Sequence, residues 1–317
     1  MRPLTPADAA SVLALTVACD EAAIGVADYT IEDVEDDFAR SSRQAWGLDG
    51  SGGRLRSMCA LERRPGETWL SAEVLACPDE PVETGACALA FVRERALEMA
   101  PAAAVHVLTY AAADRDRSWL SAAGGQVVRH YWRMSVTFTD APAKPLLPHG
   151  VTLACPGDDV EALRALHHVI DTAFLDHYGF GATVFEEWLD RHSTAPGADR
   201  DLWWLVRVDG VPASGLVARD WPDTGWVQGV GTLRAFRGRG LARMLLQTAF
   251  AEFARRGQLT VSLGVDADNP TGAVALYESV GMRVQHEALR YELPPLAHSV
   301  SEDPSPAGSM MSDSKNV

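Results

Sequence analysis

The sequence lacks the features of membrane, secreted and nucleic-acid-binding proteins. None of its apolar runs is long enough to cross a bilayer, and its first residues have no hydrophobic core of the kind found in signal peptides. The net charge of −15 disfavours binding to nucleic acids and anionic membranes, because like charges repel. We therefore expect a cytoplasmic protein that has neither nucleic acid nor a membrane as a partner.

Cysteine pairs and lysine are also scarce. The five cysteines form no CxxC pair, which predicts free thiols in a reducing compartment and no metal site. Of the 28 basic residues only Lys144 and Lys315 are lysines, a bias towards arginine that is typical of a GC-rich bacterial genome. A length of 317 residues with 47% hydrophobic content suits about two globular domains.

A glycine-rich turn stands between a predicted strand and a predicted helix. Residues Trp226–Leu233 are mostly apolar, and apolar residues recur at helical spacing from Leu241 to Phe253. The turn between them reads Arg237-Gly238-Arg239-Gly240. Glycine lets a ligand approach the backbone, and the first N–H groups of the helix have no partner within it. This arrangement predicts a phosphate or pyrophosphate site, although the turn matches neither Gly-Lys-Ser/Thr nor a full G-x-G-x-x-G pattern.

A second motif follows at residues 268–282, which read DNPTGAVALYESVGM. The apolar run Leu259–Val265 before it predicts a strand. We expect Asn269 to cap the next helix, with Pro270 in its first turn and Gly281 just past its end. Tyr277 lies within this helix, where a phenol either packs in the core or donates a proton to a reacting group.

Together the two motifs resemble those of the GNAT superfamily of acetyl-coenzyme A-dependent N-acetyltransferases. The turn reads R-G-x-G-x-A, and the second motif matches N-x-x-(x)-A-x-x-L-Y-x-x-x-G-F with Met282 in the place of Phe. The resemblance implies that the strand around Gly229 binds the thioester oxygen through its backbone and that Tyr277 is the catalytic acid for the departing thiolate. The acetyl-CoA contacts that it implies are Val230, Gly231, Thr232, Leu233, Arg237, Gly238, Arg239, Gly240, Leu241, Ala242, Arg243 and Asn269.

The N-terminal half repeats parts of this pattern. Gly85 opens an apolar helix-like run, Val105–Tyr110 reads as a strand, and Gly125 follows a second helix-like segment. Laying Gly85 on Gly240 and Gly125 on Gly281 predicts an internal repeat of about 150 residues. The expected fold is α/β (α+β): two tandem GNAT domains, each a mixed, mostly antiparallel sheet flanked by helices. Two unrelated domains with chance spacing are the alternative. The expected divisions are a degenerate N-terminal domain at 1–140, a linker at 141–150, an active C-terminal domain at 151–295 and a disordered tail at 296–317.

In this overlay the first copy lacks the chemical groups of the second. The residues that align with the turn and with Tyr277 are Val82, Glu83, Thr84 and Ser121. A glutamate at the place of the pyrophosphate would repel it. We therefore expect an N-terminal domain that does not bind coenzyme A and is structural or walls the acceptor site.

The C-terminal half also contains a candidate acceptor loop. Helices are predicted over Asp158–Phe174 and Thr183–His192, and a hairpin with Asp209-Gly210 as its turn follows them. The loop between the helices resembles that of the mycothiol synthases, tandem-GNAT enzymes in which it helps to bind the amine. The resemblance implies that three loop residues are candidate substrate contacts, namely Asp176, His177 and Tyr178. The structural alternative is that this loop caps a helix and packs against the core.

Two positions depart from that family. Trp226 stands where the family has a glutamate that relays a proton from the amine, and Gly264 stands where it has a second tyrosine. Trp226 is therefore a further candidate substrate contact, and we expect an acceptor other than the mycothiol precursor. The base that deprotonates the amine stays open among Asp266, Asp268, His286, His177 and water.

The predicted function is direct transfer of an acetyl group from acetyl-CoA to a primary amine of a small molecule within a ternary complex. The C-terminal domain would be catalytic, in a monomer or a homodimer. The alternatives are a non-catalytic acetyl-CoA sensor, an acetyltransferase of protein lysines or N-termini, and a structural or interaction protein. Tyr277 favours an enzyme, because a sensor has no need of a proton donor.

Overall fold

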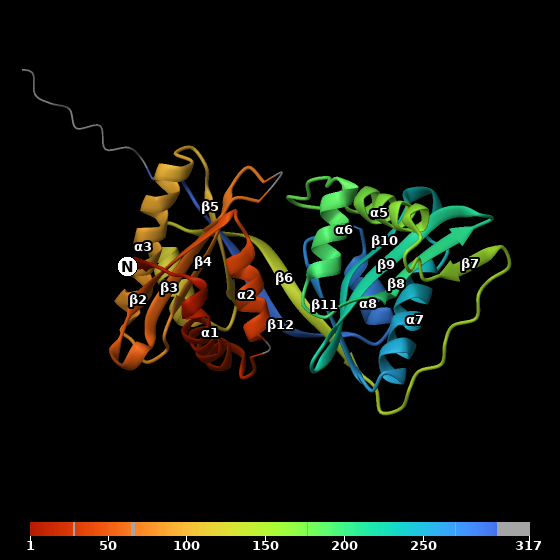
Figure 1. Cartoon of the computed structure of the whole chain (residues 1–317), viewed down its shortest axis with the longest axis horizontal. Helices are drawn as coiled ribbons and strands as arrows, with labels where there is room; N and C mark the ends of the chain where they lie inside the picture. The colour runs from red at the N-terminus through yellow and green to blue at the C-terminus, as the bar shows by residue number, and fades with distance from the viewer. Residues whose placement is uncertain (28, 65–66, 176, 270, 297–317) are drawn as a thin grey trace, which may run out of the picture.

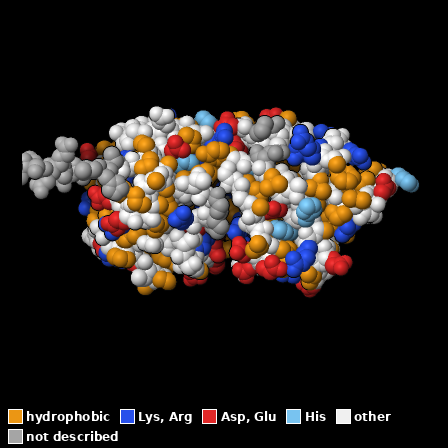
Figure 2. Space-filling model, turned by 90° about the horizontal axis from the view of Figure 1, so that it is seen from above, with side chains coloured by type: hydrophobic (Ala, Val, Ile, Leu, Met, Phe, Trp, Pro, Cys, Tyr) orange, Lys and Arg blue, Asp and Glu red, His pale blue; other side chains and the backbone are white. Residues whose placement is uncertain are grey.

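The computed structural model describes residues 1–27, 29–64, 67–175, 177–269 and 271–296, which form two lobes joined by one continuous sheet (Figure 1). Its twelve described strands lie in the order β1-β2-β3-β4-β5-β12-β6-β11-β10-β9-β8-β7. The parallel neighbours in this part of the chain are β4 with β5 and β10 with β11, and the other pairs are antiparallel. The fold is therefore the mixed, mostly antiparallel α/β arrangement that the sequence predicts. Seen from above, the lobes meet at a waist with acidic and basic side chains on both sides (Figure 2).

The N-terminal lobe consists of strands β1–β5 with helices α1–α4. Two separate clusters of buried apolar side chains lie on the two faces of its sheet, one under α1 and α2 and one under α3 and α4. The elements are β1 (Arg2–Pro3), α1 (Ala9–Ile24), α2 (Ile31–Ala39), β2 (Arg43–Asp49), β3 (Leu55–Glu62), β4 (Leu70–Ala76), α3 (Val82–Met99), β5 (Val105–Tyr110) and α4 (Asp114–Ala122).

The C-terminal lobe consists of strands β7–β11 with helices α5–α8 around one large apolar core. The hairpin between β8 and β9 turns at Asp209 and Gly210 as predicted, with the left-handed φ values of 48° and 83° that a two-residue turn requires. None of the described helices has the length and apolar character needed to cross a membrane. The elements are β7 (Val151–Ala154), α5 (Val160–Phe174), α6 (Phe185–Thr194), β8 (Ala198–Val208), β9 (Val211–Trp221), β10 (Thr224–Thr232), α7 (Leu241–Arg255), β11 (Thr260–Asp266) and α8 (Ala273–Ser279).

Two strands are exchanged between the lobes. Strand β6 (Gln126–Thr137) follows the N-terminal lobe in the chain but pairs with β11, whereas β12 (Arg283–Leu293) follows the C-terminal lobe but pairs with β5. Leu289 and Leu293 of β12 are buried in the N-terminal core, and Met134 of β6 is buried in the C-terminal core. Each lobe is thus completed by a strand from the other half of the chain. The domain division stays a prediction; residues 141–150 form neither helix nor strand, and 297–317 lie outside the described residues.

The predicted register of the repeat is wrong at its first helix. Helix α3 begins at Val82, so Gly85 lies inside the helix and does not open it. A Cβ atom at Gly85 would lie 2.6 Å from Nε1 of Trp119 on α4, well inside van der Waals contact. The glycine therefore serves the close packing of two helices and not a phosphate turn.

The register is also wrong by one residue at the second helix. Gly124 and Gly281 both have left-handed φ values, 83° and 94°. The following residue in each case donates its N–H to a carbonyl five residues earlier, from Gly125 to Leu120 and from Met282 to Tyr277. Leu120 and not Ser121 therefore occupies the place of Tyr277, and the first copy still lacks a phenol there.

Because Gly85 contacts Trp119, we expect a larger side chain at this residue to destabilise the fold. Gly85→Leu should lower the free energy of unfolding by about 2 kcal/mol or more, because the new side chain has no room against the indole ring. Ala86→Leu is the matched control on the exposed face of α3 and should change stability by less than about 0.5 kcal/mol. Denaturant titration of both variants measures the difference, and equal stabilities would show that the two helices separate without cost.

Candidate functional site

A cavity of about 520 Å³ lies at the predicted motifs and opens where two parallel strands diverge. Strands β10 and β11 are paired only from Gly225 to Val227 of β10. Beyond this point β10 contains a bulge between Val227 and Gly229 and no longer pairs with β11. Backbone groups on that side of β10 therefore have no strand partner and face the cavity.

The structure brings most of the predicted site residues to this cavity. Among the described residues Leu233, Arg239, Tyr178 and Trp226 do not line it, and Asp176 lies outside the described residues. The N–H of Leu233 is already used, since it donates to the carbonyl of Ala213 at 2.9 Å. The predicted residues that line the cavity are Val230, Gly231, Thr232, Arg237, Gly238, Gly240, Leu241, Ala242, Arg243, Asn269, His177 and Tyr277.

The glycine-rich turn has the geometry of an anion cradle. Gly238 and Gly240 adopt left-handed φ values of 77° and 76°, and no atom lies within 4 Å of the place of a Cβ at either residue. Helix α7 begins directly after Gly240, so its first N–H groups point into the space over the turn. Arg237 lines this space and donates from Nε to the carbonyl of Thr232 at 3.2 Å, whereas Arg239 turns its guanidinium over the ring of Phe236. The turn therefore fits a pyrophosphate group.

Tyr277 projects from α8 to the wall of the cavity. Its side chain is buried, with 8% of its surface exposed. Burial raises the pKa of Tyr277 to about 12. The phenol therefore keeps its proton at neutral pH, which is the state that a proton donor requires.

Asn269 does not cap the helix as predicted, because α8 begins at Ala273 with Gly272 as its N-terminal neighbour. The Asn269 side chain instead makes two hydrogen bonds within the loop: its oxygen accepts from the N–H of Thr271 at 2.8 Å, and its amide lies 3.1 Å from Nε2 of His177. The second contact joins the acceptor loop to the cofactor motif. Pro270 lies outside the described residues.

The candidate acceptor residues do not form one cluster. His177 lines the cavity, but Tyr178 turns towards the N-terminal lobe and stacks on Trp69, with ring centroids 5.4 Å apart. Trp226 lies outside the cavity and stacks on Trp221 at 4.5 Å. Tyr178 therefore connects the two lobes.

The candidate bases also lie in different places, and only some of them line the cavity. Asp266 lines the cavity and accepts the N–H of Asp268 at 2.9 Å. Asp268 itself accepts the N–H of His130 at 3.3 Å and does not line the cavity, and His286 lies on β12 against Tyr110. Of the four side chains, Asp266 and His177 thus reach the cavity.

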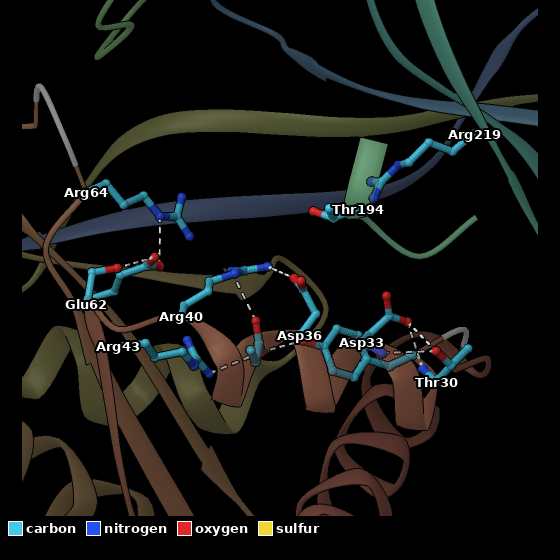
Figure 3. Close-up of polar contacts among 12 residues, drawn as sticks. Thr30, Asp33, Asp36, Arg40, Arg43, Glu62, Arg64, Thr194 and Arg219 are labelled. Atoms are coloured by element: carbon cyan, nitrogen blue, oxygen red, sulfur yellow. Dashed lines mark hydrogen bonds and ion pairs between the residues drawn. The ribbon is translucent and has the colours of Figure 1, made fainter. Parts of the chain in front are cut away.

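Sequence reasoning missed Gln228, which lines the cavity at the bulge of β10. Its side-chain oxygen accepts from Arg219 of β9 at 2.7 Å. Burial lowers the pKa of Arg219, which extends towards Thr194 at the end of α6 (Figure 3). The available signal was a polar residue in the middle of a strand whose other interior residues are apolar or glycine.

The loop before α3 in the N-terminal lobe has the opposite polarity. The Arg115 guanidinium of α4 donates to four carbonyl groups around the start of α3, those of Cys77, Pro78, Glu80 and Pro81. A loop that directs carbonyl oxygens inward holds a cation and repels a phosphate. Arg115 thus fills the loop before α3, whereas the loop before α7 in the C-terminal lobe is open.

Comparison with known sequences identifies related proteins. Residues 163–282 match the acetyltransferase (GNAT) family. Mycothiol acetyltransferases of Cellulomonas flavigena and Catenulispora acidiphila are 29% identical over 226 residues and 28% identical over 257 residues. The alignments cover 67% and 78% of this chain but 63% and 79% of those relatives, so the first spans less than two thirds of its relative's length.

Solved structures share the whole two-lobed fold. A GCN5-related N-acetyltransferase from Sphaerobacter thermophilus superposes with a TM-score of 0.79 at 27% identity, over 93% of this chain and 95% of that one. A tandem GNAT protein from the clavulanic acid biosynthesis pathway superposes with a TM-score of 0.72 over 93% of this chain and 98% of that one, and at 16% identity it supports the fold alone. With its cavity between diverging strands, its glycine-rich turn and its two lobes, this chain contains a GNAT acetyltransferase domain at residues 163–282 and resembles the tandem GNAT proteins in its whole fold.

Proposed function

We propose that this protein transfers an acetyl group from acetyl-coenzyme A to a primary amine of a small molecule, in the cavity of the C-terminal lobe. One observation carries the proposal: a single cavity joins the gap between β10 and β11, the anion cradle before α7 and the buried phenol of Tyr277. The gap suits the pantetheine arm, the cradle suits the pyrophosphate, and the phenol suits the thioester sulfur. The N-terminal lobe binds no cofactor in this proposal, because Arg115 fills its corresponding loop.

The acetyl group passes directly from donor to acceptor. Unpaired N–H groups of β10 stabilise the charge that develops on the thioester oxygen, while the cradle holds the pyrophosphate. Tyr277 protonates the departing thiolate. An amine in solution has a pKa of ~10 and must lose a proton before it attacks. The candidate bases for this step are Asp266 and His177, which line the cavity, with water as the alternative.

The acceptor side of the site supports a substrate different from that of the mycothiol synthases. By their resemblance to the mycothiol synthases, Trp226 and Gly264 correspond to two acceptor positions of that family, and Gly264 lines the cavity without a side chain. The space above Gly264 is open except for Trp226, 4.0 Å from the place of a Cβ. We propose an acceptor other than the mycothiol precursor.

A thiol-release assay tests this function. Full-length protein with acetyl-CoA and a panel of aminoglycosides, amino sugars, amino acids and polyamines should release coenzyme A with at least one amine, and mass spectrometry should show the acetylated product. Peptides with a free N-terminus or a lysine serve as the competing class. Tight coenzyme A binding without any turnover would support a sensor, and turnover of the peptides alone would contradict a small-molecule acceptor.

A further inference from the structure

Three arginines lie on the face of the sheet between the lobes. Arg129 on β6 and Arg290 on β12 are direct cross-strand partners. Arg133 follows on β6 as the second alternate residue after Arg129. Direct cross-strand partners project from the same face of a sheet, and so do alternate residues of one strand. This face therefore carries three arginines in a chain whose net charge is −15, and of the two carboxylates on the same face Glu292 is bound to His106 at 3.0 Å and Asp266 lies at the cavity.

Aromatic rings cover the faces of two of these guanidinium groups. Arg129 lies 4.1 Å above the ring of Tyr178, which stacks on Trp69 of the N-terminal lobe. Arg290 lies 5.8 Å from the Trp69 ring and 5.0 Å from that of Tyr131. Rings that cover the flat faces leave the N–H edges of a guanidinium available, and those edges are the part that binds a carboxylate or a phosphate.

Neither Arg129 nor Arg290 forms an ion pair with a carboxylate of the described residues, and Nε of Arg129 is buried without a hydrogen-bond partner among them. Two arginines that follow α2 and β3 behave differently. Arg40 and Arg64 bind Asp36 and Glu62 at 2.7 and 2.9 Å, and the dashed lines of Figure 3 show these pairs. A buried guanidinium donor without a partner costs free energy unless a ligand supplies one.

The arginine pair adjoins the cavity. Tyr178, under Arg129, directly follows His177, which lines the cavity and contacts Asn269. On the sheet, Asp266 of the cavity wall is the direct partner of Tyr131, which lies under Arg290. A molecule whose amine reaches the thioester can therefore extend along the sheet towards Arg129 and Arg290.

We infer that Arg129 and Arg290 form a subsite for an anionic group of the acceptor, so that the substrate is an amine that also carries a carboxylate or a phosphate. The inference rests on the proposed acetyltransferase function and specifies its acceptor. Tyr178 and Trp69 hold the guanidinium groups in place, which gives the N-terminal lobe a part in substrate recognition.

Anion binding tests the subsite without any turnover. Full-length protein is first saturated with coenzyme A, so that the cradle is occupied, and is then titrated calorimetrically with inorganic phosphate and with succinate at constant ionic strength. Saturable binding of at least one anion is expected. Arg129→Met and Arg290→Met, which keep an unbranched side chain over the rings, should each weaken it about tenfold or more, and Arg129→Lys should retain part of it.

Arg54→Met is the matched control, since Arg54 pairs with Asp79 on the exposed surface of the N-terminal lobe. Its anion affinity should equal that of the wild type, and thermal unfolding confirms that all variants are folded. Absence of saturable binding for both anions, or binding that survives both Met substitutions, would overturn the subsite. The coenzyme A affinity, measured separately, tests the proposed function and not the subsite.

Matched amines complete the test. Glucosamine 6-phosphate against glucosamine probes a phosphate, and leucine against leucinamide probes a carboxylate. The anionic member of at least one pair should have a kcat/KM about tenfold higher or more than the neutral member, because its KM is lower. Arg129→Met should remove this preference. Acetylation with a preference for the neutral members of both pairs would leave the acetyltransferase intact and overturn the anionic subsite.

Discussion

Replacing Gly240 with glutamate is expected to abolish coenzyme A binding. Gly240 has a left-handed φ of 76° and lies directly before the first N–H groups of α7. A carboxylate at this residue would occupy the cradle and face the pyrophosphate, and two like charges about 4 Å apart repel by ~4 kcal/mol near a protein surface. We therefore expect the affinity to fall at least about 100-fold in a calorimetric titration, with wild-type protein binding one coenzyme A per chain.

Gly257→Glu is the matched control for this variant. Gly257 follows the other end of α7, has a φ of 92° and likewise has no atom within 4 Å of the place of a Cβ. The substitution thus imposes the same charge and a similar backbone strain, of about 1 kcal/mol, away from the cavity. Equal coenzyme A affinities of the two glutamate variants would place the pyrophosphate elsewhere. A stoichiometry of two would give the N-terminal lobe a cofactor site.

Removing the hydroxyl group of Tyr277 should slow the chemical step and spare cofactor binding. Tyr277→Phe keeps the buried ring but deletes the proton donor, so kcat should fall roughly 10²-fold while the KM for acetyl-CoA stays nearly constant. Because burial raises the pKa of Tyr277 to about 12, the phenol stays protonated through neutral pH and should not cause a loss of rate below about pH 10. Steady-state kinetics with pH profiles of both proteins measure these effects.

Tyr291→Phe provides the comparison, since Tyr291 is also buried but lies in the N-terminal core and not at the cavity. Its kcat should match that of the wild type. If Tyr277→Phe also retained full turnover, Tyr277 would be a packing residue, and water or another group would protonate the thiolate.

The cofactor side of the site was predictable because it depends on short stretches of sequence. The turn from Arg237 to Gly240 carries its own conformational signal in two glycines and its own electrostatics in the helix that follows. Asp209-Gly210 specifies a hairpin in the same local way. Such features depend on φ angles and helix ends, which a few adjacent residues determine.

The parts that the sequence did not reveal depend on contacts between distant segments. Nothing in the alternation of β6 or β12 indicates which edge each strand will pair with, because a pleated strand has the same pattern beside any partner. The overlay of Gly85 on Gly240 is wrong because a glycine that makes room for Trp119 looks the same in the sequence as one that turns the chain. The stacking of Tyr178 on Trp69 likewise joins residues from the two lobes.

The strand exchange determines when the N-terminal lobe can be completed during synthesis of the protein. The N-terminal lobe contains β1–β5, but the strand that pairs with the open edge of β5 is β12, at residues 283–293. While the ribosome is still adding the C-terminal lobe, that edge has unpaired backbone groups, and its apolar core lacks Leu289 and Leu293. The first lobe therefore remains incomplete, and open to pairing with other nascent chains, until the C-terminal lobe and β12 after it have been made.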